Sequence, residues 1–341
     1  MPGRYRELEV AGTPLEIGQQ IGEIAREEVC GFAAIALERV NKTVAISRAS
    51  ALEIARQSAA HVEHYAPHML DELRGMAQSS GVSFDNLMLL QVRNQLQPTE
   101  DAGCTSFAGD AAIVAQNWDN DPALDPFTLV LTRRPTGKPA LMNITQAGLI
   151  AYIGLNSAGI ALCLNSLPAP SRTWGVPHYF TVRAIYESTS IDEAIQAVRR
   201  AQRAIPANIM LATPQGPADM EITIDDVHVL RDEDLVTHTN HCLHPDLKHI
   251  NPDFPELIES GPRLDRINHI LGSVPLTVAR AKAALRDHDN HPRSICRHAN
   301  DHPATGFWVS VFSVVIEAAA GRMHVSRGNP CENEYETYQL S

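Results

Sequence analysis

The apolar pattern of the chain changes near residue 103, and this change constrains the fold more than any other feature of the sequence. Residues 1 to about 100 carry apolar side chains at helical spacing, with Thr13 and Ser83 placed as N-caps and a helix break expected before Pro67. Beyond residue 103, short apolar runs alternate with turn residues, which predicts β-hairpins. The chain therefore begins as a helical layer and continues as sheet.

The strand-rich part is divided in turn by a second set of helices. This order suits antiparallel sheets packed between helical layers in one α+β domain, residues 1–341, because neither a linker nor a repeat divides the chain. The expected hairpins span residues 103–119, 127–148, 149–167 and 307–328, and the later helices lie within residues 177–201, 255–272 and 276–287.

Charge and hydropathy limit the possible partners. The 341 residues carry a formal net charge of −12, whereas nucleic-acid binding needs a basic surface, so no nucleic-acid partner is expected. No apolar run reaches membrane-spanning length, and the N-terminus lacks a basic end followed by an apolar core. The sequence thus predicts a cytoplasmic protein with no membrane partner.

Six cysteines are scattered along the chain without a CxxC pair, so reduced thiols are expected. Most should be buried packing residues, including Cys163, Cys242, Cys296 and Cys331. Cys104 differs, because it follows a glycine at the start of a predicted strand. It is the candidate for a chemical role.

Polar side chains collect at the ends of the predicted strands. Asp119 ends the strand that pairs with the strand of Cys104, so hairpin pairing can bring the two residues together. Asn165 and Asn240 each end a later strand, and Arg297 comes just before the last hairpin. A nucleophile, a carboxylate, two amides and a guanidinium are the groups that acyl-transfer chemistry requires.

Cys104 has no evident histidine partner, although histidine is the usual base beside a nucleophilic cysteine. Another base would appear if the peptide bond before Cys104 were cut, because a free α-amine has a pKa of about 8. Gly103 suits such a cut, since a residue without a side chain leaves room for attack on its carbonyl.

A set of motifs gives the sequence a specific resemblance. They are GTPLEIGQQIGE, GCTSFAG with QNWD, GLNSAGIALCLN, THTNH, SICRH and RGNPCENEYETY, and they extend over almost the whole chain. With these motifs, in the same order, the chain resembles the family of acyl-coenzyme A:6-aminopenicillanic-acid acyltransferases (isopenicillin N acyltransferases), a branch of the N-terminal-nucleophile (Ntn) hydrolases. The pair GCT and QNWD, together with SICR, is the most discriminating.

The resemblance implies a four-layer αββα sandwich of two antiparallel sheets between helical layers. It also implies a proenzyme that cuts itself between Gly103 and Cys104, with the fragments 1–103 and 104–341 remaining associated. Cys104 would then be the nucleophile of both processing and catalysis. Among the other matching positions, Asp119 would hold the freed amine, Asn240 would be the oxyanion-hole residue, Arg297 the active-site arginine, and Asn165 the second asparagine of the related bile-salt hydrolases.

The substrate class follows from the same resemblance. We expect a linear, non-peptide amide of a small molecule, cleaved or transferred through a thioester on Cys104, with an acyl donor such as an acyl-coenzyme A as a further partner. Bile-salt hydrolases carry arginine where this chain has Gln116, and the acyltransferase branch carries glutamine, which argues against a bile-acid substrate. Gln116, Asn117 and Trp118 are candidate substrate-binding residues, although Trp118 also fits a core position.

Two other functions remain open at this point. The first is a metal-dependent hydrolase, since histidine is a common ligand and histidines crowd residues 238–249 and 288–302. Neither run has HExxH spacing on a predicted helix, so we expect surface histidines, no metal site and no cofactor. The second is a catalytically inactive binding protein of the same fold.

Overall fold

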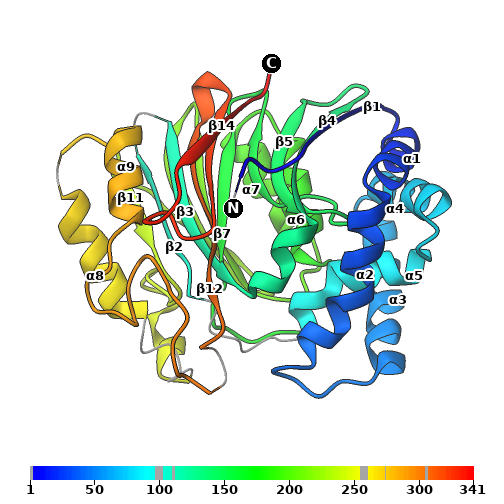
Figure 1. Ribbon diagram of the computed structural model, residues 1–341, viewed down its shortest axis with the longest axis horizontal. Coiled ribbons are helices and arrows are strands. Elements are labelled where there is room, and N and C mark those ends of the chain that lie inside the picture. The colour runs from blue at the N-terminus through cyan, green and yellow to red at the C-terminus, as the bar shows by residue number, and fades with distance from the viewer. Residues whose placement is uncertain (1–2, 97–102, 110–111, 254–259, 273, 304–305) are drawn as a thin grey trace.

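The computed structural model describes residues 3–96, 103–109, 112–253, 260–272, 274–303 and 306–341. These residues form two β-sheets that pack face to face, with helices on both outer sides (Figure 1). The expected α+β class and the four-layer αββα order are therefore confirmed.

The larger sheet has eight strands and forms one face of the interior. It consists of β1 (Glu7–Gly12), β4 (Thr128–Pro135), β5 (Leu141–Gln146), β6 (Ile153–Asn156), β7 (Ala161–Asn165), β8 (Ala207–Thr213), β9 (Gly216–Ile222) and β10 (Val227–Leu230), in this spatial order. All neighbouring strands run antiparallel except β1 and β4, which run parallel.

The smaller sheet has six strands and faces the first across the interior. Its spatial order is β11 (Leu235–His238), β2 (Thr105–Gly109), β3 (Ile113–Asn120), β12 (Val309–Glu317), β13 (Arg322–Arg327) and β14 (Tyr335–Gln339), and all pairs are antiparallel. The neighbouring strands β2 and β3 are buried almost throughout, because helices cover one face of this sheet and the larger sheet covers the other.

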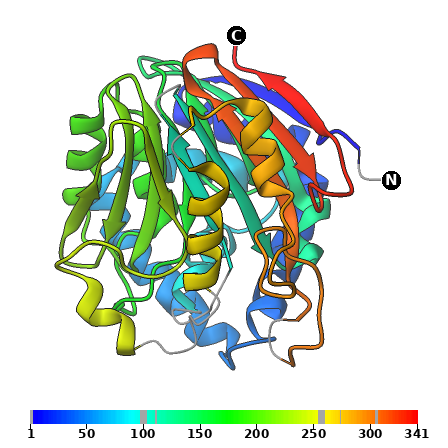
Figure 2. The same cartoon turned by 90° about the vertical axis from the view of Figure 1, so that its left-hand side faces the viewer.

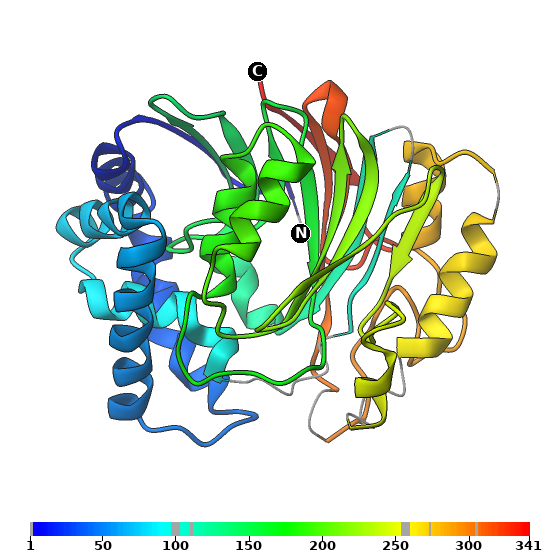
Figure 3. The same cartoon turned by 180° about the vertical axis from the view of Figure 1, so that it is seen from behind.

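Helices form the two outer layers. On the smaller sheet lie α8 (Ser260–Leu271) and α9 (Val278–Leu285) (Figure 2). On the side of the larger sheet lie α6 (His178–Tyr186) and α7 (Ile191–Arg199), together with the N-terminal group α1 (Pro14–Ile24), α2 (Arg26–Val40), α3 (Arg48–Tyr65), α4 (Pro67–Ser80) and α5 (Phe84–Val92) (Figure 3). Within the described residues, no helix combines the length and apolarity that crossing a membrane requires.

Most local predictions agree with the structure. The hairpins β2–β3, β4–β5, β6–β7 and β12–β13 are present, and Thr13 and Ser83 cap α1 and α5. The helix break before Pro67 is confirmed, since α3 ends at Tyr65. The predicted Gly-Asp turn includes residue 110, and the predicted helix start lies near residue 255. Both positions belong to segments outside the described residues, namely 110–111 and 254–259.

Strand β1 was not predicted and corrects the interpretation of residues 1 to about 100 as helical. Its first five residues alternate exposed and buried positions, which is the period of a strand that covers a core on one face. Its pairing with β4 joins residues more than a hundred positions apart. Such a parallel edge contact also means that the larger sheet is mixed rather than purely antiparallel.

The N-terminal helices are tied to the strands by buried charges. The carboxylate of Glu72 on α4 pairs with Arg133 of β4 at 2.8 Å and with Arg183 of α6 at 2.9 Å, and all three side chains are buried. Helix α1 reaches α4 closely, since a Cβ on Gly18 would lie 1.9 Å from the carbonyl oxygen of Glu72. The helices before residue 97 and the strands after residue 103 thus share one core.

Candidate active site

Cys104 stands immediately before β2, and its main chain is held on both sides. Its backbone N–H donates to Oδ1 of Asn240 at 3.0 Å. Its carbonyl oxygen accepts from Nη1 of Arg263 at 2.6 Å and from Nδ2 of Asn165 at 3.3 Å. The residue is 3% exposed, so these bonds fix it inside the protein rather than on a surface loop.

The carboxylate of Asp119 and the guanidinium of Arg297 meet at Gly103. A Cβ atom placed on Gly103 would lie 3.4 Å from Oδ2 of Asp119 and 2.6 Å from Nη1 of Arg297. Ser310 of β12 links the two residues, because its Oγ donates to Oδ1 of Asp119 at 2.6 Å and accepts from the backbone N–H of Arg297 at 3.0 Å. Both charged groups are therefore placed beside the bond between Gly103 and Cys104.

Asn240 follows β11, and its neighbours fix the orientation of its amide. Its Oδ1 accepts from the backbone N–H of Cys104 and from Nη2 of Arg263 at 2.8 Å. Its Nδ2 donates to the carbonyl oxygen and Oγ of Ser166 at 3.1 and 3.0 Å. The N–H of Cys104 and Nη2 of Arg263 can only donate, and the Ser166 carbonyl can only accept, so only one placement of the oxygen and nitrogen of this amide satisfies all three. The carbonyl group of Asn240 thus faces the nitrogen of Cys104.

Asn165 ends β7 in the opposite sheet and reaches the same place. Besides Cys104, its Nδ2 donates to the carbonyl oxygen of Thr239 at 2.8 Å, and its Oδ1 accepts from Oγ of Ser106 at 2.7 Å. The side chain therefore crosslinks the two sheets at the site. The structure thus brings together the predicted catalytic and cleavage residues, which are Gly103, Cys104, Asp119, Asn165, Asn240 and Arg297.

Burial and charge keep the Cys104 thiol protonated in the uncut chain. Burial raises the pKa of this thiol to about 12, and the negative charge of Asp119 adds to the rise. The positive charge of Arg263 and hydrogen bonds from the Asp119 backbone and the Gln116 side chain lower that pKa only in part. The site needs a base before the sulfur can act as a thiolate.

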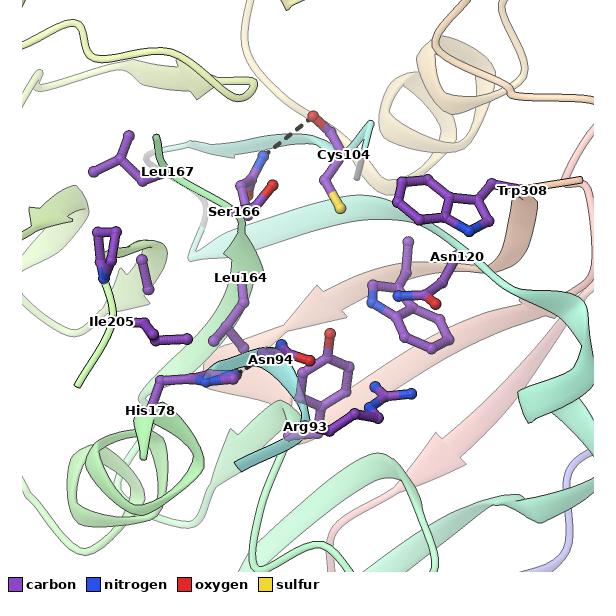
Figure 4. A pocket seen from close by; sticks show the side chains of 15 residues that line it. Arg93, Asn94, Cys104, Asn120, Leu164, Ser166, Leu167, His178, Ile205 and Trp308 are labelled. Atoms are coloured by element: carbon purple, nitrogen blue, oxygen red, sulfur yellow. Dashed lines mark hydrogen bonds between the residues drawn. The ribbon is translucent and has the colours of Figure 1, made fainter. Parts of the chain in front are cut away.

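The Cys104 side chain opens into a cavity of about 120 Å³ between the sheets and the N-terminal helices (Figure 4). Aromatic side chains and amides make up much of the cavity wall. His178 also lines the cavity, and burial lowers its pKa to about 3, so its imidazole is neutral. The residues that line the cavity are Arg93, Asn94, Cys104, Trp118, Asn120, Tyr152, Leu164, Asn165, Ser166, Leu167, His178, Ile205, Pro206, Ala207 and Trp308.

The three candidate substrate-binding residues on β3 do not all face the cavity side of the strand. Trp118 lines the cavity and stacks on Phe312, with ring centroids 4.8 Å apart. Gln116 is buried, and its amide forms a pair of hydrogen bonds with the main chain of Leu164. Asn117 donates to the carbonyl oxygens of Leu285 and Ile295 on the helical side. The structure does not bring Asn117 to the cavity, because successive side chains of a strand face opposite sides.

Several residues at the site carry no signal in the sequence. Arg263 is one of two arginines on α8, and it bonds to both Cys104 and Asn240. Ser310 is one small residue in an apolar strand. Arg93 follows α5 and lines the cavity, although its helix shows no catalytic pattern. Each is recognisable only once distant segments are placed in space.

Comparison with known proteins gives a family and several relatives. The sequence profile described as "Acyl-coenzyme A:6-aminopenicillanic acid acyl-transferase" matches residues 106–332. The chain is 28% identical to the acyl-coenzyme A:6-aminopenicillanic-acid-acyltransferase 40 kDa form of Emericella nidulans, over 97% of this chain and 94% of that protein.

Solved structures are more distant. Penicillin V acylase from Agrobacterium tumefaciens has a TM-score of 0.43 at 11% identity, covering 66% of this chain and 82% of that chain. A variant of conjugated bile acid hydrolase from Clostridium perfringens has a TM-score of 0.40 at 12% identity, covering 70% of this chain and 97% of that chain.

Proposed function

Because the chain belongs to the acyl-coenzyme A:6-aminopenicillanic acid acyl-transferase family, we propose that it is an autoprocessing cysteine enzyme of the Ntn type. It cleaves, or transfers the acyl group of, a linear amide of a small molecule through a thioester on Cys104. The single observation that carries this proposal is the fixed main chain of Cys104, with Asn240 on its nitrogen and two charged side chains at Gly103.

Processing begins at the bond between Gly103 and Cys104. The sulfur of Cys104 attacks the carbonyl carbon of Gly103. Its thiol proton passes through the carboxylate of Asp119 to the nitrogen of Cys104 as the C–N bond breaks. Water then hydrolyses the thioester, which leaves a carboxylate on Gly103 and a free thiol and amine on Cys104. Arg297 and Asp119 lie beside the bond that breaks, where they can stabilise and exchange the charges that develop.

The new amine then supplies the general base for the reaction with the substrate. Its pKa of about 8 allows it to accept the thiol proton near neutral pH. The sulfur attacks the acyl carbonyl of the substrate, the amine returns the proton to the leaving amine, and water or a second amine resolves the thioester. Asp119 holds the amine, together with Oδ1 of Asn240, which already accepts from the nitrogen of Cys104.

The oxyanion of the substrate needs donors, and the two asparagines are proposed for this role. Nδ2 of Asn240 donates to Ser166 at the cavity wall, so it must exchange that partner for the substrate oxygen. Asn165 carries the second amide, which donates to the carbonyl oxygen of Cys104. Loss of one such donor costs about 3 kcal/mol of activation free energy.

After the cut, the fragments 1–103 and 104–341 remain associated. The buried pairs of Glu72 with Arg133 and Arg183 support this, because separation would expose or strand three charges. The shared hydrophobic core of helices and strands supports it as well.

Intact-mass spectrometry of the purified protein tests the proposal. We expect two fragments, the second beginning at Cys104, and a single uncut chain for Cys104→Ala. Cys30→Ala is the matched control, because Cys30 lies on α2 and contacts the carbonyl oxygen of Ser80, and this variant should be cut as fast as the wild type. An acyl-transferring wild-type protein that stays in one piece would contradict the free-amine mechanism.

A further inference from the structure

Two histidines and two cysteines from separate segments converge on one point near the C-terminus. One donor atom each from His288, Cys296, His298 and Cys331 lies within 4.8 Å of every other. Nε2 of His298 lies 3.0 Å from Nε2 of His288, 3.7 Å from Sγ of Cys296 and 3.3 Å from Sγ of Cys331, and the two sulfurs are 3.6 Å apart.

These distances match the edges of a tetrahedron around a zinc ion. Zn–S and Zn–N bonds of about 2.3 and 2.05 Å give edges of about 3.8 Å between sulfurs, 3.6 Å between sulfur and nitrogen and 3.3 Å between nitrogens. A disulfide would need the two sulfurs about 2.05 Å apart, so the observed separation belongs to two thiols.

The surroundings of the cluster also suit a metal. Nε2 of His298 faces the sulfurs, while its Nδ1 lies 3.9 Å from the carboxylate of Glu332, which is an ion-pair distance and not a hydrogen bond. Nδ2 of Asn329 lies 3.6 Å from Sγ of Cys296 and can donate to a thiolate. The outer contact with Asn329 is of the kind that stabilises a metal-bound thiolate.

We propose that His288, Cys296, His298 and Cys331 form a Cys₂His₂ zinc site. Binding of Zn²⁺ to two neutral imidazoles and two thiols releases two protons, which leaves a neutral tetrahedral centre. All four positions are taken by the protein, so the site is closed and structural. The proposal differs from the expectations that the chain has no metal site and that Cys296 and Cys331 are packing residues.

The site also bears on the catalytic centre through Arg297, which lies between two of the ligands. The carbonyl oxygen of Arg297 accepts from Nδ2 of Asn329 at 2.6 Å, and its N–H donates to Ser310, the partner of Asp119. A zinc ion would join the segment around residue 297 to the turn around residue 331, and thereby hold Arg297 at Gly103.

Metal analysis of tag-free protein tests this site. After equilibration with zinc and removal of the excess, we expect about one zinc per chain, and native mass spectrometry should give the apo mass plus zinc minus two protons. Cobalt in place of zinc should give the intense visible bands of a tetrahedral thiolate complex. A folded wild-type chain that binds no zinc, or one lighter by the two hydrogens of a disulfide, would overturn the proposal.

Variants locate the site without depending on activity. Cys331→Ser and His288→Asn should each lose most of the bound zinc and lower the melting temperature of the zinc-loaded protein. Cys30→Ser is the matched control and should bind zinc like the wild type, since Cys30 lies outside the cluster. If Cys331→Ser retained the zinc affinity of the wild type, the assignment of the ligands would be wrong.

Discussion

Replacement of Gly103 by alanine should slow self-cleavage without damaging the mature site. The added Cβ would lie 2.6 Å from Nη1 of Arg297, and an ordinary contact requires about 0.8 Å more. Gly103 is not among the glycines with positive φ, so alanine is compatible with its backbone and the effect is confined to this contact. The variant must therefore displace Arg297, the scissile bond or both.

The expected magnitude follows from that displacement. A misplacement of 1 Å at a reacting centre can cost about 100-fold in rate. For a shift somewhat below 1 Å we expect cleavage to slow by roughly 10- to 100-fold, which corresponds to about 1.4 to 2.7 kcal/mol of activation free energy. Once cut, the alanine becomes the end of the first fragment, so the activity per cut chain should be unchanged.

Cell-free synthesis followed by intact-mass spectrometry measures the effect, because the fraction of uncut chain can be followed from the end of translation. Gly261→Ala is the matched control: it lies on α8 close to Arg263, and a Cβ there meets no atom within 4 Å. This control should be cut at the wild-type rate. Cleavage of Gly103→Ala at the wild-type rate would refute the argument that Gly103 and Arg297 are in productive contact.

Three further changes probe the supports of the site. Ser310→Ala removes the hydroxyl that joins Asp119 to the Arg297 backbone and should lower kcat roughly tenfold, with wild-type stability in urea unfolding as the check on the fold. Glu72→Gln leaves two buried arginines without their shared carboxylate and should lower the free energy of unfolding by about 3 kcal/mol; an unchanged urea midpoint would contradict the network. Burial raises the pKa of Asp219 to about 7, so between about pH 4 and 7 the folded chain keeps a proton that the unfolded chain releases. The free energy of unfolding should therefore fall by up to about 1.4 kcal/mol for each unit that the pH rises in this range. Asp219→Asn should remove that part of the slope in urea unfolding measured at several pH values.

The nucleophile could be located from the sequence because its geometry is local. Cys104 and Asp119 lie near the open ends of two strands joined by one hairpin, and antiparallel pairing alone brings such residues together. The asparagines came from the resemblance to a family, whose motifs carry their order along the chain. The layer order could be predicted as well, since it follows from the sequence of helical and strand patterns.

The features that could not be predicted from the sequence depend on strand register and on contacts between distant segments of the chain. Adjacent residues on β3 were grouped as substrate-binding, yet the alternation of a strand sends Asn117 to the helical side and Trp118 to the cavity. Strand β1 pairs with β4 across more than a hundred residues. The proposed zinc site joins part of the histidine-rich run 288–302 to Cys331, which lies beyond the hairpin of β12 and β13, so no short spacing in the sequence groups the four ligands.

The uncut chain explains why processing and activity are coupled in this proposal. As long as Gly103 is attached, the nitrogen of Cys104 is an amide that donates to Asn240 and cannot accept a proton. The thiol meanwhile has a pKa of about 12, so its thiolate is scarce near neutral pH. Cutting one bond changes both conditions, because the amide becomes an amine held by the same asparagine, beside the same sulfur. The contacts that place the bond for cleavage therefore also place the product of cleavage for catalysis.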